Sequence, residues 1–305
     1  MMMKKTAIRK IAWESLGDLP NFRFIPKVKY TQSKKLDYCF QNKFRFDNRA
    51  GSTVIGYLFK PLNFDRTKKY PTIHYLHLHS DNYRLGKDEL LKEKNANWLL
   101  RKWLKAGFLV YCIDSYCFGD RMQAEIKDEE SYLAKYNLLY GRTLWGMMLR
   151  DELLLINYIK SLSYINKKRI SIGGVSMGCT KALWLSALTD IYQSVFGLLC
   201  TTRLNDLIQK RGLNEHGIYY YPFGLLKNFD LEILYSCIYP KKLLLINGEN
   251  DKLTPTSGVK KITKNLKQVY KNKSANFQSQ IIKKTGHQFT REMAKTTYKW
   301  TTDLS

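Results

Sequence analysis

One stretch decides the fold of this 305-residue chain: Gly174-Val175-Ser176-Met177-Gly178. A short run typical of a strand, Arg169-Ile170-Ser171-Ile172-Gly173, precedes it, and residues 179–189 are typical of a helix. A sharp strand-to-helix turn holds the serine at its apex in a strained backbone conformation and exposes its hydroxyl. Glycine two positions before and after that serine removes the clashes that side chains would cause there. The stretch therefore predicts a nucleophile elbow with Ser176 as the candidate nucleophile.

A serine nucleophile needs a histidine that takes its proton and a carboxylate that orients the histidine. Behind an elbow of this type the order along the chain is serine, acid, histidine. Two of the five histidines, His216 and His287, follow Ser176. His287 stands beside Gly286 on a loop after the strand-like run 277–282, which suits a projecting base. We therefore predict His287 as the base, since His216 falls in a stretch where a cap is usually inserted.

The acid is expected between these two residues. The apolar run Leu243-Leu244-Leu245-Ile246 is typical of a strand buried on both faces, and it leads into Asn247-Gly248-Glu249-Asn250-Asp251. Asp251 lies on the loop after that strand and is the predicted acid. Glu249, nearer the strand end, is the alternative and could instead brace the loop. Taken singly each residue has an ordinary structural role, such as a serine N-cap; three matches in the right order favour a catalytic triad.

Composition indicates a globular protein. Hydrophobic residues make up 44% of the chain and aromatic residues 13%. No apolar run approaches the roughly 18 residues that a membrane span needs. The start is basic, but residues 11–18 hold two acids and no apolar core of a signal peptide, which favours a cytoplasmic protein. The 6 cysteines are dispersed without metal-type pairs, so we expect free thiols and neither a metal nor a cofactor.

The net charge of +25 is concentrated at the two ends of the chain. Residues 1–70 carry 16 Lys and Arg against 5 Asp and Glu, and residues 252–305 carry 12 against 2. Such a charge can attract nucleic acid, anionic membranes or anionic substrates. Because no RNA-binding or helix-turn-helix signature accompanies it, we interpret it as a lysine-rich surface and expect no nucleic-acid partner.

Alternating strand and helix patterns follow a leading hairpin formed by residues 36–46 and 52–60. This order predicts an α/β fold with a mostly parallel central sheet and helices on both faces. Residues 1–35 are expected to form an N-terminal arm and residues 36–305 a single domain. The candidate serine, acid and histidine then lie at the carboxyl ends of strands, on one rim of the sheet.

Residues 201–240 interrupt this alternation and are predicted to form a small cap insertion over that rim. They contain Tyr219, Tyr220 and Tyr221, which we predict to line the substrate pocket or to pack the cap onto the body. Attack on an ester creates an oxyanion that needs N–H donors held in place. The backbone N–H of Met177 is the first predicted donor. A second is expected from the loop 75–82, which lacks glycine.

These features resemble the α/β-hydrolase superfamily, and more narrowly its dienelactone-hydrolase and acetyl-xylan-esterase-like branch, over roughly residues 35–300. The residues that carry the resemblance are Tyr75-Leu76-His77-Leu78-His79, Asp114, Phe118-Gly119-Asp120-Arg121, Gly141-Arg142-Thr143, the elbow, His216-Gly217-Ile218-Tyr219-Tyr220-Tyr221-Pro222, Asn247-Gly248-Glu249-Asn250-Asp251 and Gly286-His287.

The resemblance implies that Ser176, Asp251 and His287 are nucleophile, acid and base, and that His79 is the second oxyanion donor. It also implies bracing roles for Asp120 and Arg121. Members usually have His-Gly where this chain has His77-Leu78, and the Arg-Gly-Gln motif of the acetyl-esterase subset is absent, so acetyl sugar esters are not implied.

Three hypotheses follow. The first is a cofactor-free serine hydrolase that cleaves a small carboxylic ester through an acyl-enzyme on Ser176. The second keeps the triad and changes the reaction to that of an acyltransferase, lactonase or peptidase. The third is a non-catalytic basic binding protein on a hydrolase scaffold.

Overall fold

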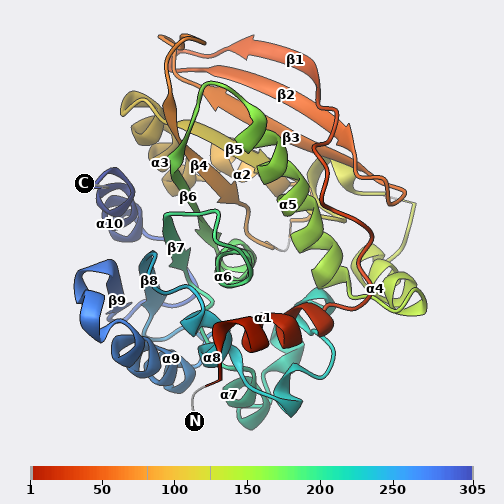
Figure 1. Cartoon of the computed structure of the whole chain (residues 1–305), viewed down its shortest axis with the longest axis vertical. Coiled ribbons are helices and arrows are strands. Elements are labelled where there is room, and N and C mark those ends of the chain that lie inside the picture. The colour runs from red at the N-terminus through yellow and green to blue at the C-terminus, as the bar shows by residue number, and fades with distance from the viewer. Residues whose placement is uncertain (1–2, 81, 124, 304–305) are drawn as a thin grey trace.

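A twisted nine-stranded sheet organises the protein, in a computed structural model that describes residues 3–80, 82–123 and 125–303 (Figure 1). The strand order is β1-β2-β3-β5-β4-β6-β7-β8-β9. The strands are β1 Lys29–Lys35, β2 Phe40–Asp47, β3 Thr53–Lys60, β4 Tyr70–Leu76, β5 Leu109–Ile113, β6 Ile165–Val175, β7 Ser194–Leu198, β8 Lys242–Gly248 and β9 Phe277–Ile282.

The sheet is mostly parallel, as the sequence predicts. The first three strands and β5 pair antiparallel, and β2 and β3 form the expected hairpin, with Phe40 opposite Lys60. From β5 to β9 each neighbouring pair is parallel. Leu76 pairs with Gly174 and Val175 with Leu198, so β4, β6 and β7 end at the same level. Their carboxyl ends therefore form one rim, where α/β folds bind ligands.

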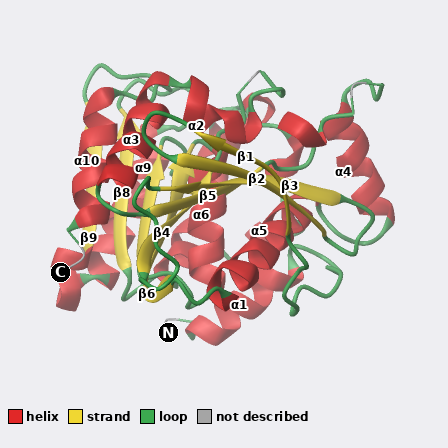
Figure 2. Ribbon diagram, turned by 90° about the horizontal axis from the view of Figure 1, so that it is seen from above, coloured by secondary structure: helices red, strands yellow, loops and turns green. Residues whose placement is uncertain are grey.

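Helices cover both faces of the sheet (Figure 2). They are α1 Lys5–Glu14, α2 Glu89–Lys92, α3 Lys94–Lys105, α4 Glu129–Leu139, α5 Leu144–Ser161, α6 Met177–Leu188, α7 Leu204–Gln209, α8 Leu231–Ser236, α9 Thr256–Val269 and α10 Arg291–Thr302. Buried residues of α3 and α10 pack on one face, and those of α1, α5, α6, α8 and α9 pack on the other. No helix within the described ranges is long and apolar enough to cross a bilayer.

Burial of apolar side chains on both faces explains why the central strands read as continuous hydrophobic runs. All five residues of β5 are buried, and six of the seven in β8 are buried. Between α3 and α10, the Trp103 indole N–H donates a hydrogen bond of 2.8 Å to the Thr301 hydroxyl. All six cysteines are buried free thiols, in agreement with the sequence analysis.

Three segments add to the sequence-based picture. In the predicted N-terminal arm, β1 extends the sheet by pairing with β2, while Ile8 and Ala12 of α1 are buried. Residues 89–105 form two helices, α2 and α3, because Glu93 between them has an extended backbone. Residues 201–240, called the cap segment or cap below, lie between β7 and β8 and contain α7, α8 and three short 3-10 turns joined by loops.

Candidate active site

Ser176 stands at the apex of a tight turn between β6 and α6. Its backbone has φ 54° and ψ −115°, a strained conformation for a residue with a side chain. A Cβ atom at Gly174 or at Gly178 would lie 2.0 Å from the Leu76 carbonyl oxygen. Both glycines are therefore required by the close approach of the turn to the end of β4, as the elbow pattern predicts.

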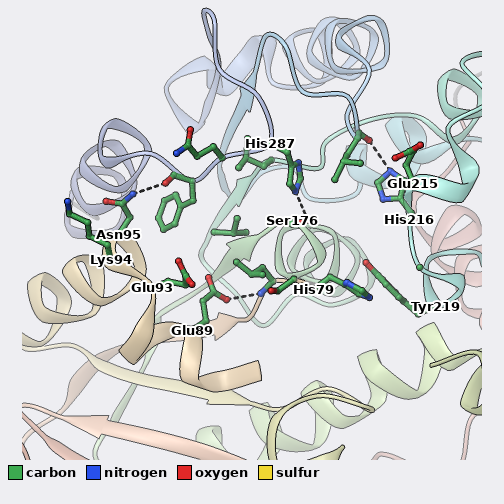
Figure 3. A pocket seen from close by; sticks show the side chains of 18 of the residues that line it. His79, Glu89, Glu93, Lys94, Asn95, Ser176, Glu215, His216, Tyr219 and His287 are labelled. Carbon is green, nitrogen blue, oxygen red and sulfur yellow. Dashed lines mark hydrogen bonds between the residues drawn. The ribbon is translucent and has the colours of Figure 1, made fainter. Parts of the chain in front are cut away.

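The structure brings together the serine, histidine and acid that were selected from the sequence. Figure 3 shows Ser176 and His287 pointing toward each other. His287 Nε2 lies 2.9 Å from Ser176 Oγ, and His287 Nδ1 lies 2.8 Å from Asp251 Oδ2. An ionised carboxylate only accepts hydrogen bonds, so Nδ1 carries the imidazole proton and Nε2 is free to accept the serine proton. The three groups come from separate loops, after β6, β8 and β9, on one rim of the sheet.

Asp251 and Glu249, the two candidates for the acid, have different environments. Asp251 is buried, and its second oxygen accepts the Leu253 N–H at 2.9 Å. Glu249 is exposed and accepts the Lys284 N–H at 3.0 Å. Glu249 therefore ties the Asp251 loop to the His287 loop, while Asp251 contacts the imidazole.

His216, the other histidine after Ser176, lies in the same cavity but outside this chain of hydrogen bonds. Its Nε2 contacts the Leu253 carbonyl oxygen at 2.9 Å, and its ring stacks on Tyr220 at 4.8 Å. Burial lowers the pKa of His216. It packs the cap against the loop that carries Asp251.

The loop after β4 lies against the elbow, since a Cβ at Gly178 would also meet the His77 carbonyl oxygen at 3.1 Å. Met177 is the first residue of α6, and the first amide groups of a helix have no acceptor within it. In the facing loop, the Leu78 N–H donates to Glu89 Oε2 at 2.7 Å. His79 Nε2 contacts Glu130 Oε2 of α4 at 2.7 Å, and the backbone N–H of His79 remains the candidate oxyanion donor.

Two fully buried ionisable groups flank this loop. Glu89 accepts the Tyr75 hydroxyl at 2.5 Å, and burial raises the pKa of Glu89 to about 7. His77 accepts the Ser115 N–H at Nε2, at 3.0 Å, and its Nδ1 lies 2.7 Å from the Leu78 carbonyl oxygen. Burial, and then the nearby Lys181 ammonium, lower the pKa of His77 to about 3, so His77 is neutral.

A buried polar chain continues from this loop beneath the elbow. Lys181 of α6 donates to Ser115 Oγ at 2.7 Å and to Glu152 Oε1 of α5 at 2.8 Å. Glu152 Oε2 lies 2.8 Å from His74 Nε2, and each of these side chains is buried. This network was not predicted from the sequence. The available signals were Lys181, the one charged residue of α6, and the charged run Arg150-Asp151-Glu152 in the middle of α5.

A cavity of about 710 Å³ opens above Ser176, within the size range of small-molecule sites. Its wall includes side chains of the cap, of α2 and α3, and of the loop after β9. Of the three tyrosines selected from the sequence, Tyr219 lines the cavity and stacks on the His79 ring at 5.3 Å. Tyr220 is buried in the cap, and the Tyr221 hydroxyl donates to the Leu213 carbonyl; neither belongs to the cavity wall.

Comparisons with known proteins agree with the fold. No family model matches the chain. The "Putative hydrolase YtaP" of Bacillus subtilis (strain 168) is 32% identical over 272 residues, which cover 88% of this chain and 88% of that protein. Among solved structures, a glucuronoyl esterase from Solibacter usitatus aligns with a TM-score of 0.73 at 12% identity, over 97% of this chain and 91% of that one. Acetyl xylan esterase 1 from Thermoanaerobacterium sp. JW/SL YS485 aligns with a TM-score of 0.63 at 16% identity, over 98% and 93%. At such identities the solved structures share the fold with this chain.

Proposed function

We propose that the chain, which belongs to the family of the Bacillus subtilis YtaP protein, is a serine esterase of the acetyl-xylan-esterase-like branch of the α/β-hydrolases and acts on small carboxylic esters. The observation that carries the proposal is the unbroken relay from Ser176 Oγ through His287 to Asp251, with contacts of 2.9 and 2.8 Å. The names of the relatives, a hydrolase and several esterases, support the same reaction class.

In the proposed reaction His287 Nε2 takes the Ser176 proton while Oγ attacks the ester carbonyl carbon. The Asp251 carboxylate stabilises the imidazolium that forms. The N–H groups of Met177 and His79 are the proposed donors to the oxyanion, one from each side of the turn. Collapse breaks the bond to the alcohol, which leaves with the proton from His287. Water then repeats the attack on the acyl-enzyme, with His287 again as base, and releases the carboxylic acid.

The cavity favours a small substrate whose acyl and alcohol parts contact different surfaces, one apolar and one polar. Leu78, Val175, Leu199 and Tyr219 are apolar or aromatic and come from four separate elements near the serine. Glu93, Lys94 and Asn95 of the α2–α3 region and Asn214 and Glu215 of the cap are polar and line the outer part of the wall. A short acyl group fits the inner apolar surface, and an alcohol that bears polar groups fits the outer one. Tyr219 is therefore the proposed substrate contact among the three tyrosines.

The test compares the wild type with Ser176→Ala on p-nitrophenyl acetate and butyrate. Loss of the nucleophile should lower kcat by on the order of 10⁶-fold. Ser171→Ala is the matched control, because Ser171 is a buried serine of β6, the strand that leads into Ser176, and its hydroxyl has no partner among the described residues. The control should keep the wild-type rate. Equal rates for Ser176→Ala and the wild type would discard the proposal.

The acyl acceptor is tested separately. Product analysis in the presence of added alcohols or amines distinguishes hydrolysis, in which the free acid accumulates, from acyl transfer. We expect the free acid to dominate. Accumulation of the transferred ester or amide at the expense of the acid would replace the esterase with an acyltransferase that uses the same residues.

A further inference from the structure

We propose that Glu89 is a positioning residue for the oxyanion hole and that, together with His77, it fixes the backbone N–H of His79 as the second donor. The inference rests on the proposed esterase function and concerns how its transition state is stabilised. Glu89 is the first residue of α2 and is fully buried. It is one of the residues that line the cavity above Ser176 (Figure 3).

Glu89 decides which amide of the loop is free. Its Oε2 accepts the Leu78 N–H at 2.7 Å, and its Oε1 accepts the Tyr75 hydroxyl at 2.5 Å. Leu78 is the position where a donor to the oxyanion would otherwise compete with His79. Because Glu89 Oε2 accepts this N–H whether the carboxyl group is ionised or neutral, the Leu78 N–H is committed to Glu89.

His77 orients the next peptide group. A backbone N–H can only donate, so the contact of 3.0 Å from Ser115 N to His77 Nε2 makes that nitrogen an acceptor. The proton of the neutral ring is then on Nδ1, which donates to the Leu78 carbonyl oxygen at 2.7 Å. The tautomer of His77 is therefore fixed by the structure around it.

The Leu78 carbonyl and the His79 N–H belong to the same planar trans peptide, so they point in opposite directions. Since the carbonyl points to the buried His77 ring, the His79 N–H points away from it. The cavity wall includes both Leu78 and His79. A hydrogen bond to the carbonyl end of a peptide also polarises its N–H end, which strengthens the donor. The two buried side chains thus hold consecutive peptides in one orientation.

The hydrogen bonds of Glu89 and His77 to the two peptide groups of Leu78, called the Leu78 clamp below, explain how a leucine fits where the family that this sequence resembles usually has glycine. The left-handed backbone of the loop is at Ser80, with φ 58°, and not at Leu78. Leu78 therefore needs no glycine-like conformation, and its orientation comes from hydrogen bonds on both sides. The Lys181 ammonium, which donates to Ser115, connects the Leu78 clamp to α6, the helix that carries Met177.

The experiment replaces Glu89 by two residues of similar size. Glu89→Gln keeps an oxygen that accepts the Leu78 N–H, and Glu89→Met fills the same space without an acceptor. We measure kcat and KM on p-nitrophenyl acetate, the melting temperature, and the inhibition constant of a phenylboronic acid that forms a tetrahedral adduct on serine. Asp230→Ala is the matched control, because Asp230 is also a buried carboxylate that accepts backbone N–H groups, those of Leu204 and Leu231, but lies outside the cavity wall.

For Glu89→Met we expect kcat to fall by on the order of 10²-fold with KM within about twofold, as for a misplaced oxyanion donor. The inhibition constant of the boronic acid should rise by a similar factor, since the boronic acid binds as a transition-state analogue. Glu89→Gln should recover kcat to within about fivefold of the wild type, and Asp230→Ala should keep kcat while losing stability. If Glu89→Met does not fold, the double variant Tyr75→Phe/Glu89→Met replaces it, because it leaves one buried donor fewer without a partner.

Three results overturn the inference: a rise in KM with kcat unchanged, an unchanged boronic-acid constant, or equal deficits in Glu89→Gln and Glu89→Met. A wild-type protein that hydrolyses no ester defeats the proposed function itself. A wild type that hydrolyses esters, with a fully active Glu89→Met, defeats only the positioning role.

Discussion

Gly178→Ala should damage both the stability and the activity of the protein, because no space for a methyl group exists at the elbow. The added Cβ would lie 2.0 Å from the Leu76 carbonyl oxygen and 2.7 Å from the Leu76 carbonyl carbon. Real Cβ atoms do not approach other heavy atoms more closely than about 3.0 Å, so the two backbones must separate by about 1 Å. Neither partner is a flexible side chain: Leu76 ends a central strand and Gly178 belongs to the first turn of α6.

The size of the effect follows from that displacement. Forcing one extra carbon into packed structure costs about 1–3 kcal/mol. For a chain of 305 residues, a loss of that size lowers Tm by about 2–5 °C. Moving the start of α6 by 1 Å also moves Ser176 and Met177 relative to His287, and a misplacement of this order costs about 10²-fold in rate.

The assay combines a thermal melt with initial rates on p-nitrophenyl acetate. Gly212→Ala is the control, since its Cβ would meet other atoms only at 3.7 Å or more, and its φ of −93° suits alanine. The control should melt and turn over like the wild type. If Gly178→Ala also matches the wild type in Tm and kcat, the close approach of the elbow to β4 is wrong.

Three further substitutions probe the relay and the buried network. Asp251→Asn should lower kcat by about 10⁴-fold with little change in Tm, because the amide no longer fixes the His287 tautomer; a loss below tenfold contradicts the proposed acid. His77 has a pKa of about 3 in the folded protein, lowered by burial and then by Lys181, against about 6.5 unfolded. Between pH 3 and pH 6.5 the His77 ring is protonated in the unfolded chain and neutral in the folded protein. His77 therefore lowers the free energy of unfolding by about 1.4 kcal/mol per pH unit as the pH drops from 6.5 towards 3. Urea unfolding of His77→Gln at several pH values between 6 and 4 gives the dependence of its free energy of unfolding on pH, which should be weaker than that of the wild type by that amount. An unchanged pH dependence refutes the low pKa of His77. Lys181→Met should cost about 3–5 kcal/mol in urea unfolding, because it leaves the Glu152 charge buried without its cation; near-wild-type stability contradicts an ion pair there.

Much of the fold was predictable because buried strands appear in the sequence as short apolar runs. The fully buried β5 and β8 read as short apolar runs, and the hairpin of β2 and β3 reads as two β-rich segments around a polar turn. The edge strand β1 was not predictable, since all of its residues are exposed and its sequence is polar. The helix α4 was missed for a related reason. Apolar residues occur all around it, so it lacks the one-sided pattern that marks a surface helix.

The candidate relay was predictable because each member follows a recognisable strand and the chain order is fixed by the fold. The choice between Asp251 and Glu249 needed coordinates, since both lie on one loop and only their contacts separate them. The Leu78 clamp could not be predicted. Glu89 stands 11 residues beyond Leu78 in a polar stretch with no motif, and its burial depends on how α2 folds over the end of β4.

The central claim is that Ser176 is a nucleophile activated by His287. A fluorophosphonate probe tests it without any assumption about the substrate: the protein is incubated with the probe, digested, and mapped by mass spectrometry. We expect one adduct, on the peptide that contains Ser176, and its disappearance in both Ser176→Ala and His287→Ala. An unmodified Ser176 in the folded wild type, or an adduct at Ser176 that forms equally fast in His287→Ala, contradicts it.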